Sequence, residues 1–236
     1  MLQTLTPSLQ TFPFQTSPIK RQYHQWKAQI ESKQASQAEF EKWLFLHAAT
    51  VLFEEKAGEL LTLMADQFGL TIRQQVAYVD QVACLWDVAY RVVHETDFSL
   101  KFVIYQPHMV QAQLNSVPPC MLQDELEYPV NITPAQFLAE IERRWLATNS
   151  IPHEVGFALG YPVKDVLGFM GLQPMVCSGC CGWQVYGEFA PSQQLGQRFL
   201  EARLEAIRFL HCPVKDININ RQAESCPPFC KCQMCS

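Results

Sequence analysis

The run from Ile151 to Glu188 constrains the fold more than any other part of the chain, because proline and glycine divide it into short segments. Pro152 suits the first turn of a helix, where its missing N–H is not needed. Gly160 suits the end of that helix, and Pro162 can begin a second helix. The apolar and aromatic residues that close the run are typical of a short strand. The run therefore predicts two short helices followed by a strand.

The same run also resembles a known family. It reads PHEVGFALGYPVKDVLGF and later CCGWQVYGE. These letters are similar to two blocks of a bacterial domain-of-unknown-function family, DUF3793, whose members carry PHE-x-G-x-x-LGYP-x-x-DV-x-GF and then C-G-x-W-x-VYG. The resemblance is dense over residues 152–188 and weaker from about Ala38 to Leu210. It implies the extent of one domain and a set of residues to examine, and it implies no reaction.

A second segment, LHAATVLFEEKAGELL, carries part of the resemblance. Lys56 and Gly58 match the family there, whereas Ala48 and Ala49 stand where a Cys-Ala-Pro-type run is usual. The missing cysteine argues against a mechanism that uses a thiol at this place. His47 lies on an apolar helix face, and we expect it to be a core histidine with one hydrogen bond rather than a ligand.

Composition and charge narrow the possible function classes. The chain has 236 residues, 48% hydrophobic and 17% charged, which fits one large globular domain or two small ones. A net charge of −5 gives no strong electrostatic footprint for nucleic acid. The longest apolar run, Trp43 to Phe53, is much shorter than the roughly 20 residues that a membrane helix needs. We therefore expect neither a nucleic-acid partner nor a membrane span.

The cysteines and the N-terminus together indicate a compartment. The N-terminus shows no positive segment followed by an apolar stretch, so a secretory signal is not expected. A cytoplasmic location follows as the expectation, and the ten cysteines would then be mostly reduced thiols. Their even number does not by itself indicate disulfides.

Helical and strand periodicities alternate in the first half of the chain. Residues 38–53 repeat apolar side chains at three- and four-residue intervals, and we expect a second helical segment up to Met64. Residues 70–94 fit a helix capped by Thr71, although their second half also fits a strand paired with residues 100–106. We favour the strand for that half.

The second half of the chain has clearer helix starts. Thr133, Pro134 and Gln136 form a capping-box start for one helix. Pro191 opens a last helix that ends near Leu210. Helices surrounding a few strands indicate a single α+β domain with a small sheet.

Three parts are predicted along the chain. Residues 1–37 hold a flexible leader and a surface helix, because residues 1–20 are rich in Gln, Thr, Ser and Pro and have little to bury. Residues 38–210 form the family-like globular domain. Residues 211–236 form a polar, cysteine-rich tail.

His153 and Glu154 are the first candidate catalytic residues. The positive end of a helix dipole favours the Glu154 carboxylate and keeps the His153 imidazole neutral, which suits a base or a metal ligand. The alternative is that Glu154 only stabilises the first turn while His153 bonds a backbone carbonyl. A zinc-protease pattern is absent, because Phe157 stands where the second histidine would be. With Lys56 in the same cleft, the pair would suffice for acid–base or metal-assisted chemistry.

Three aromatic residues in or next to the family blocks are candidates for cofactor binding: Tyr161, Trp183 and Tyr186. The alternative is an ordinary core role for them. Buried tyrosine hydroxyls would then need hydrogen-bond partners.

Cys177, Cys180 and Cys181 form a C-x-x-C-C pattern. Such a pair can hold half of a zinc site or act as a redox couple. A thioredoxin-like role is disfavoured, because the pattern precedes the expected strand instead of following it. Packing in the core remains the alternative for Cys181.

Four thiols lie close together near the C-terminus: Cys226, Cys230, Cys232 and Cys235. Such a density of sulfur can supply a tetrahedral zinc site or anchor an iron–sulfur cluster. The spacing matches no standard zinc finger closely, and the alternative is a tail of spare thiols.

Two functions remain open from the sequence. One is a redox- or metal-associated enzyme or accessory protein that acts through a His/Glu/Cys site on an unknown small molecule or protein. The other is a non-catalytic module that binds a metal or another ligand and carries a thiolate tail. A pocket in which Lys56 and His153 converge would favour the enzyme.

Overall fold

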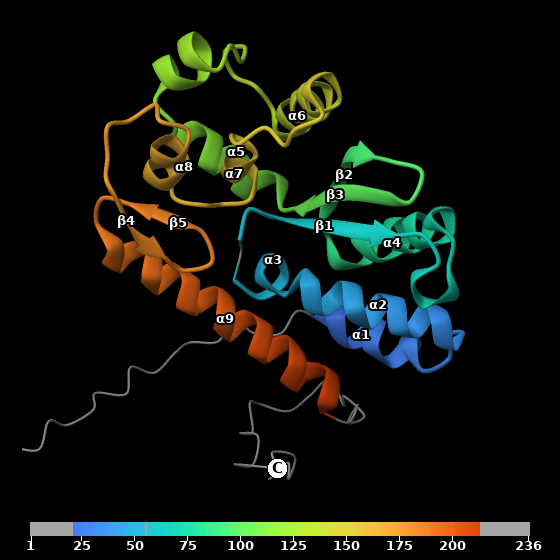
Figure 1. The fold of residues 1–236 in the computed structure, drawn as a ribbon. Helices are drawn as coiled ribbons and strands as arrows, with labels where there is room; N and C mark the ends of the chain where they lie inside the picture. The colour runs from blue at the N-terminus through green and yellow to red at the C-terminus, as the bar shows by residue number, and fades with distance from the viewer. Residues whose placement is uncertain (1–20, 55, 213–236) are drawn as a thin grey trace, which may run out of the picture.

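The computed structural model describes residues 21–54 and 56–212, which form an α+β fold around a three-stranded antiparallel sheet. The strands are β1 (Gly58–Met64), β2 (Ala89–Glu95) and β3 (Ser99–Tyr105), and their order in the sheet is β1-β3-β2. Helices cover both faces of this sheet (Figure 1). Over the described residues, each helix is too short or too polar to cross a bilayer.

The central strand β3 shows why the sheet is buried on both sides. Leu100, Phe102 and Ile104 point into one hydrophobic core, and Val103 and Tyr105 point into the other. Alternate residues of a strand face opposite sides of its sheet. A strand between two cores therefore reads as an almost continuous apolar run.

The first helical layer packs its aromatic residues beneath the sheet. Trp26, Phe45 and Trp86 lie with ring centroids 4.6 to 5.5 Å apart. The elements of this layer are α1 (Arg21–Ile30), α2 (Ala35–His47), α3 (Ala49–Phe53), a 3₁₀ turn η1 (Gln67–Gly69) and α4 (Ile72–Trp86).

The second helical layer covers the opposite face. Its longest helix starts at a capping box: the Thr133 hydroxyl accepts from the Gln136 N–H at 3.3 Å, and the Gln136 side chain accepts from the Thr133 N–H at 3.0 Å. The elements are α5 (Pro107–Ser116), a π-helical turn η2 (Met121–Glu125), α6 (Pro134–Thr148), α7 (Val155–Ala158) and α8 (Val163–Phe169).

A hairpin and a long last helix connect the two layers. The hairpin pairs β4 (Cys177–Cys180) with β5 (Gln184–Tyr186), and β5 packs on α8. The last helix, α9 (Phe189–His211), begins beside this hairpin and runs along α3 and α2 of the first layer (Figure 1). The hairpin is therefore held between α8 and α9.

Most of the expected elements are present, with clear exceptions. The capped helix followed by a strand in residues 70–94 is confirmed, and so is the strand pairing with residues 100–106. The helical segment expected up to Met64 is wrong, because those residues form β1. Their leucines are buried on both faces, and a short apolar run of that kind cannot be told from a buried helix by periodicity.

Two further expectations need correction. His47 is exposed and donates one hydrogen bond from its Nδ1 to the Trp43 carbonyl at 2.8 Å, so it is not a core histidine. The surface helix expected before residue 38 is present as α1, but Tyr23, Trp26 and Ile30 are buried in the first core. The predicted leader, residues 1–20, and the four tail cysteines lie outside the described residues.

Candidate functional site

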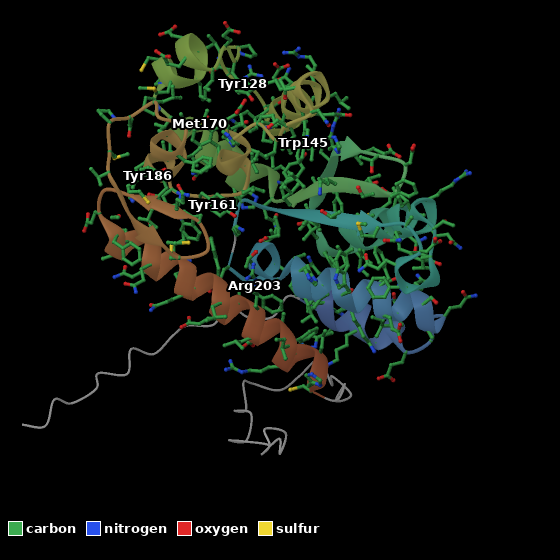
Figure 2. The ribbon with its side chains drawn as sticks, viewed as in Figure 1. Tyr128, Trp145, Tyr161, Met170, Tyr186 and Arg203 are labelled. Atoms are coloured by element: carbon green, nitrogen blue, oxygen red, sulfur yellow. The ribbon has the colours of Figure 1, made fainter. Side chains whose placement is uncertain are left out.

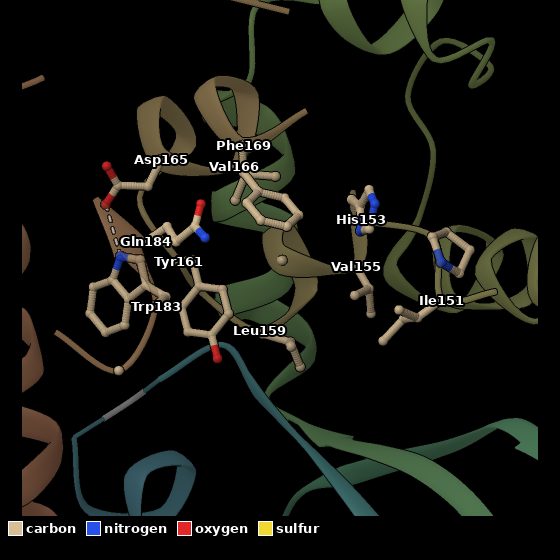
Figure 3. Close-up of a pocket in the computed structure, with 13 residues that line it drawn as sticks. Ile151, His153, Val155, Leu159, Tyr161, Asp165, Val166, Phe169, Trp183 and Gln184 are labelled. Carbon is tan, nitrogen blue, oxygen red and sulfur yellow. Dashed lines mark hydrogen bonds between the residues drawn. The ribbon is translucent and has the colours of Figure 1, made fainter. Parts of the chain in front are cut away.

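A pocket of about 280 Å³ lies between α7, α8 and the start of β5 (Figure 3). Its lining is mostly apolar, with an imidazole and an amide at its edges. The lining residues are Ile151, Pro152, His153, Val155, Gly156, Leu159, Tyr161, Asp165, Val166, Phe169, Gly182, Trp183 and Gln184. All of them come from the run that the sequence singled out.

Glycines allow the elements around the pocket to approach closely. A Cβ atom on Gly156 of α7 would lie 2.9 Å from a Val166 methyl group on α8. A Cβ atom on Gly168 would lie 2.4 Å from the Tyr186 ring, so the hairpin can rest on α8 only because residue 168 has no side chain. Gly160 has a φ of +73°, which lets the chain leave α7 through the left-handed region.

Stacked aromatic rings form one wall of the pocket. The Tyr161 and Trp183 rings lie 5.0 Å apart with an interplanar angle of 24°. Behind them, the Phe199 ring of α9 lies 6.0 Å from Trp183. Figure 3 shows Trp183, Tyr161 and Gln184 together on this side of the pocket.

The Asp165 carboxylate fixes that wall. Asp165 is 2% exposed and accepts from the Trp183 indole N–H at 2.8 Å and the Tyr186 backbone N–H at 2.9 Å. It also accepts from the Ser192 hydroxyl at 2.7 Å and the Lys164 ammonium at 2.6 Å. Burial alone would raise the pKa of Asp165, but these four hydrogen bonds outweigh it and hold the pKa below its ordinary value. The carboxylate therefore stays ionised and joins α8, the hairpin and α9.

The opposite side of the pocket is more open. The His153 ring meets the Phe169 ring edge to face, with centroids 4.9 Å apart. His153 is exposed, and Phe169 is 47% exposed although it sits on the last turn of α8. These two rings form the mouth of the pocket.

Glu154 points away from this pocket, although it follows His153 directly. Its carboxylate accepts from the Arg144 guanidinium at 2.9 Å and from the Tyr128 hydroxyl at 3.2 Å. Arg144 also donates to the Leu126 carbonyl at 2.6 Å and stacks over the Tyr128 ring. Of the pair that we expect to share one cleft, His153 therefore lines this pocket and Glu154 does not.

Lys56 lies behind the aromatic wall rather than in the pocket. Its ammonium donates to Glu59 at 2.7 Å and lies 5.2 Å from the Tyr161 ring centroid and 5.0 Å from that of Phe199. Burial lowers the pKa of Lys56, and the neighbouring Glu59 carboxylate opposes that shift. In Figure 2, Tyr161 lies on the side of the second helical layer that faces α9, and the label Arg203 marks α9. Lys56 thus supports Tyr161 through a cation–π contact.

Tyr186 belongs to the frame of the site. Its ring packs over Gly168, its N–H donates to Asp165, and its hydroxyl donates to the Gln184 side chain at 2.9 Å. Of the three aromatic candidates, Tyr161 and Trp183 line the pocket and Tyr186 does not.

The hairpin cysteines do not gather with further potential metal ligands among the described residues. Cys177 and Cys180 are exposed, and Cys181 is half-buried and donates to the Ser192 carbonyl at 3.4 Å. Burial raises the pKa of Cys181, which disfavours its thiolate. Across residues 21–54 and 56–212, no group of three or more His, Cys, Asp or Glu side chains is placed to hold a metal. The four tail cysteines proposed as ligands for zinc or an iron–sulfur cluster lie beyond those residues.

Three residues of the site were missed from the sequence: Asp165, Phe169 and Gln184. Asp165 and Phe169 stand in the DV-x-GF part of the first block, and Gln184 stands within the second. An acid next to a lysine on a short helix is common on surfaces, and only the hairpin that folds over it makes Asp165 a buried acceptor.

Comparison with known proteins gives one match. The family model described as "Protein of unknown function (DUF3793)" matches residues 44–218, a span that includes the whole pocket and Lys56. The comparison with curated proteins and the comparison with solved structures each give no match.

Proposed function

Since the chain belongs to the DUF3793 family, whose description names no activity, we propose a function from the pocket itself: the domain binds a flat, mostly apolar small molecule. The observation that carries this proposal is the stacked wall of Tyr161 and Trp183, held by the buried Asp165 carboxylate. Ligand sites in proteins are typically concave and apolar, with few polar groups and volumes of about 300–1,000 Å³. A volume of about 280 Å³ lies just below this range, so the ligand should be small.

The aromatic wall is ordered before any ligand arrives. The Trp183 indole is fixed by its hydrogen bond to Asp165 at 2.8 Å and by its stacking on Tyr161. A side chain that is already immobilised loses little conformational entropy on binding, and this favours affinity. Planar rings gain most from offset-stacked or edge-to-face contacts with such a wall.

The charges around the pocket favour an uncharged ligand. Asp165 is paired with Lys164, Glu154 with Arg144, and Lys56 with Glu59. No charged side chain among the described lining residues is left to neutralise an ionic ligand. Gln184 and His153 remain at the edges of the pocket for one or two hydrogen bonds.

The same arrangement favours binding over catalysis. The candidate acid–base residues Lys56 and Glu154 are each ion-paired outside the pocket, so they do not converge with His153. General acid–base work requires groups within hydrogen-bond reach of one substrate. We therefore prefer the ligand-binding module to the enzyme.

A cytoplasmic location also belongs to this proposal. Cys177 and Cys180 are exposed free thiols, and such thiols persist in reducing compartments. The net charge of −5 supports a small-molecule or protein partner over nucleic acid.

The test is a binding screen with matched flat and saturated ring compounds that are uncharged at neutral pH, such as 1-naphthol beside decahydro-1-naphthol and phenol beside cyclohexanol. Ligand-observed NMR should detect the flat compounds binding to the full chain, and Trp183→Ala should weaken that binding about two- to tenfold, since stacking on an aromatic contributes about 0.5–1.5 kcal/mol beyond area burial. Trp43→Ala is the control, because Trp43 is also half-buried but lies on α2, outside the pocket. Equal binding of flat and saturated rings, or equal losses in both variants, would reject the proposal.

A further inference from the structure

The outer face of α9 carries a stripe of exposed aliphatic side chains. Leu200 is 56% exposed, and Leu204 and Ile207 are each 42% exposed. At 100° per residue, these three positions fall within an arc of about 60° on the helix. Scattered exposed leucines are ordinary, whereas a contiguous stripe on one helix is typical of a contact surface.

The stripe is separate from the face that α9 uses within its own chain. The buried residues of the second half of α9 are Phe199, Ala202, Ala206 and Phe209. Their mean direction lies about 150° around the helix from the stripe. The helix therefore has two apolar faces, and the described part of the chain covers one of them (Figure 1).

Charged residues beside the stripe point to its partner. Glu201 and Arg208 are exposed, lie on the same flank of the stripe and are two turns apart. A two-fold axis that passes between them would bring Glu201 of each copy to Arg208 of the other. The same axis would place Leu204 against its own equivalent and Leu200 beside Ile207. The surface is thus self-complementary, as a symmetric dimer requires.

We propose that α9 pairs with α9 of a second copy of this chain, in an antiparallel arrangement, through Leu200, Leu204 and Ile207. The direction follows from charge. In a parallel pair, residues on opposite flanks and five positions apart meet across the interface, so Arg203 would face Arg208 of the partner subunit. That contact is repulsive and occurs twice. The antiparallel pairing makes two Glu–Arg contacts, and it brings only Arg203, which lies 3.8 Å from Glu59 of its own chain, near its own equivalent.

The proposed interface is small, so the dimer is weak. One helix face buries less than the roughly 1,200 Å² at which stable interfaces begin. The dimer should therefore form at high protein concentration and dissociate on dilution. The pocket wall packs against Phe199, on the buried face of α9, and the proposed interface lies on the opposite, exposed face. Dimerisation therefore leaves the mouth of the pocket, at His153 and Phe169, open.

Sedimentation velocity of the full chain in reducing buffer tests the proposal, with protein from about 1 µM to about 1 mM. The wild type should shift from monomer to dimer over this range. Leu204→Glu should raise the dissociation constant at least about tenfold, because it buries two unpaired carboxylates at the centre of the interface. Leu146→Glu is the control, since Leu146 is 63% exposed on α6, and it should leave the dissociation constant unchanged.

A charge exchange tests the antiparallel direction. Glu201→Arg should weaken the dimer about two- to tenfold, because each copy then sets Arg against Arg. Adding Arg208→Glu in the same chain should restore the wild-type constant. A wild type that stays monomeric at all concentrations, as it would if residues 213–236 of the same chain covered the stripe, would overturn the proposal. A dimer that Leu204→Glu does not weaken, or a double variant that does not recover, would overturn it as well.

Discussion

Replacing Asp165 with asparagine removes the charge that holds the pocket wall while keeping the side chain's shape. The carboxylate accepts four hydrogen bonds, two on each oxygen: Trp183 and Ser192 on one, Lys164 and Tyr186 on the other. An asparagine side chain has one oxygen, so one pair of donors would face an NH₂ group. The Ser192 hydroxyl can rotate to accept instead, but the N–H groups of Trp183 and Tyr186 cannot.

The cost can be worked from these contacts. A hydrogen bond to a charged group contributes about 1.5–3 kcal/mol, and at least one such bond is lost while the others weaken. Because the Lys164 side chain is 29% exposed, water screens its share of the interaction. We expect Asp165→Asn to reduce the free energy of unfolding by about 3 kcal/mol, within a range of about 2–4.

Urea unfolding followed by circular dichroism measures this loss. Glu142→Gln is the control: its ion pair with Arg91 is 2.6 Å long but half-exposed, so its removal should cost less than about 1 kcal/mol.

The pH dependence of the same difference gives a second test. Because the folded pKa of Asp165 is depressed, its contribution is fully present above the unfolded value of about 3.9 and is lost as the pH falls through the folded pKa. The difference between wild type and Asp165→Asn should therefore shrink below about pH 4. A loss under about 1 kcal/mol at pH 7, or a difference that does not depend on pH, would refute this account of the wall.

Three further predictions concern other parts of the molecule. Arg144→Met should cost about 3–5 kcal/mol in urea unfolding, because it leaves the buried Glu154 carboxylate without a cation; a value close to that of the Arg143→Met control would count against this pairing. Gly168→Ala should lower the free energy of unfolding by at least about 2 kcal/mol, because its Cβ would lie 2.4 Å from the Tyr186 ring. Gly171→Ala is the control: its Cβ meets nothing within 4 Å, so its only cost is the strain of a φ of +72°. Equal losses in the two variants would show that the hairpin does not rest on α8. We also propose that the tail cysteines bind zinc or an iron–sulfur cluster, so replacing Cys226, Cys230, Cys232 and Cys235 with serine should abolish bound metal in elemental analysis without changing the far-UV spectrum, and unchanged metal content would reject it.

The sequence was most informative where backbone chemistry is local. The capping box at Thr133 and the turn between β2 and β3 depend on residues a few positions apart, and both elements form where they were expected. Proline and glycine divided residues 151–188 into the two short helices and the β5 strand that the structure contains. The strand β4 was missed, because Cys177 to Cys180 have none of the alternation that marks a half-buried strand.

Some of the pocket residues could be predicted from the sequence, but the directions of their side chains depend on tertiary contacts and could not. Tyr161, Trp183 and His153 were identified and do line one pocket. The directions of neighbouring side chains, however, depend on what lies beyond them: Glu154 turns to an arginine on α6, and His153 turns to the mouth. Asp165 acquires its importance only when the hairpin and α9 bring three donors to it, and no spacing in the sequence indicates that.

Fluorine NMR of protein labelled with 5-fluorotryptophan tests the central claim, that the Trp183 wall binds a flat apolar molecule. The chain has five tryptophans, so the spectrum should hold five resonances, which single Trp→Phe variants assign. Titration with quinoline should shift the Trp183 resonance saturably and leave those of Trp26, Trp43 and Trp86 unchanged, because these three lie in the first layer, away from the pocket. A titration that leaves Trp183 unshifted, or that shifts the first-layer tryptophans in its place, would contradict the claim.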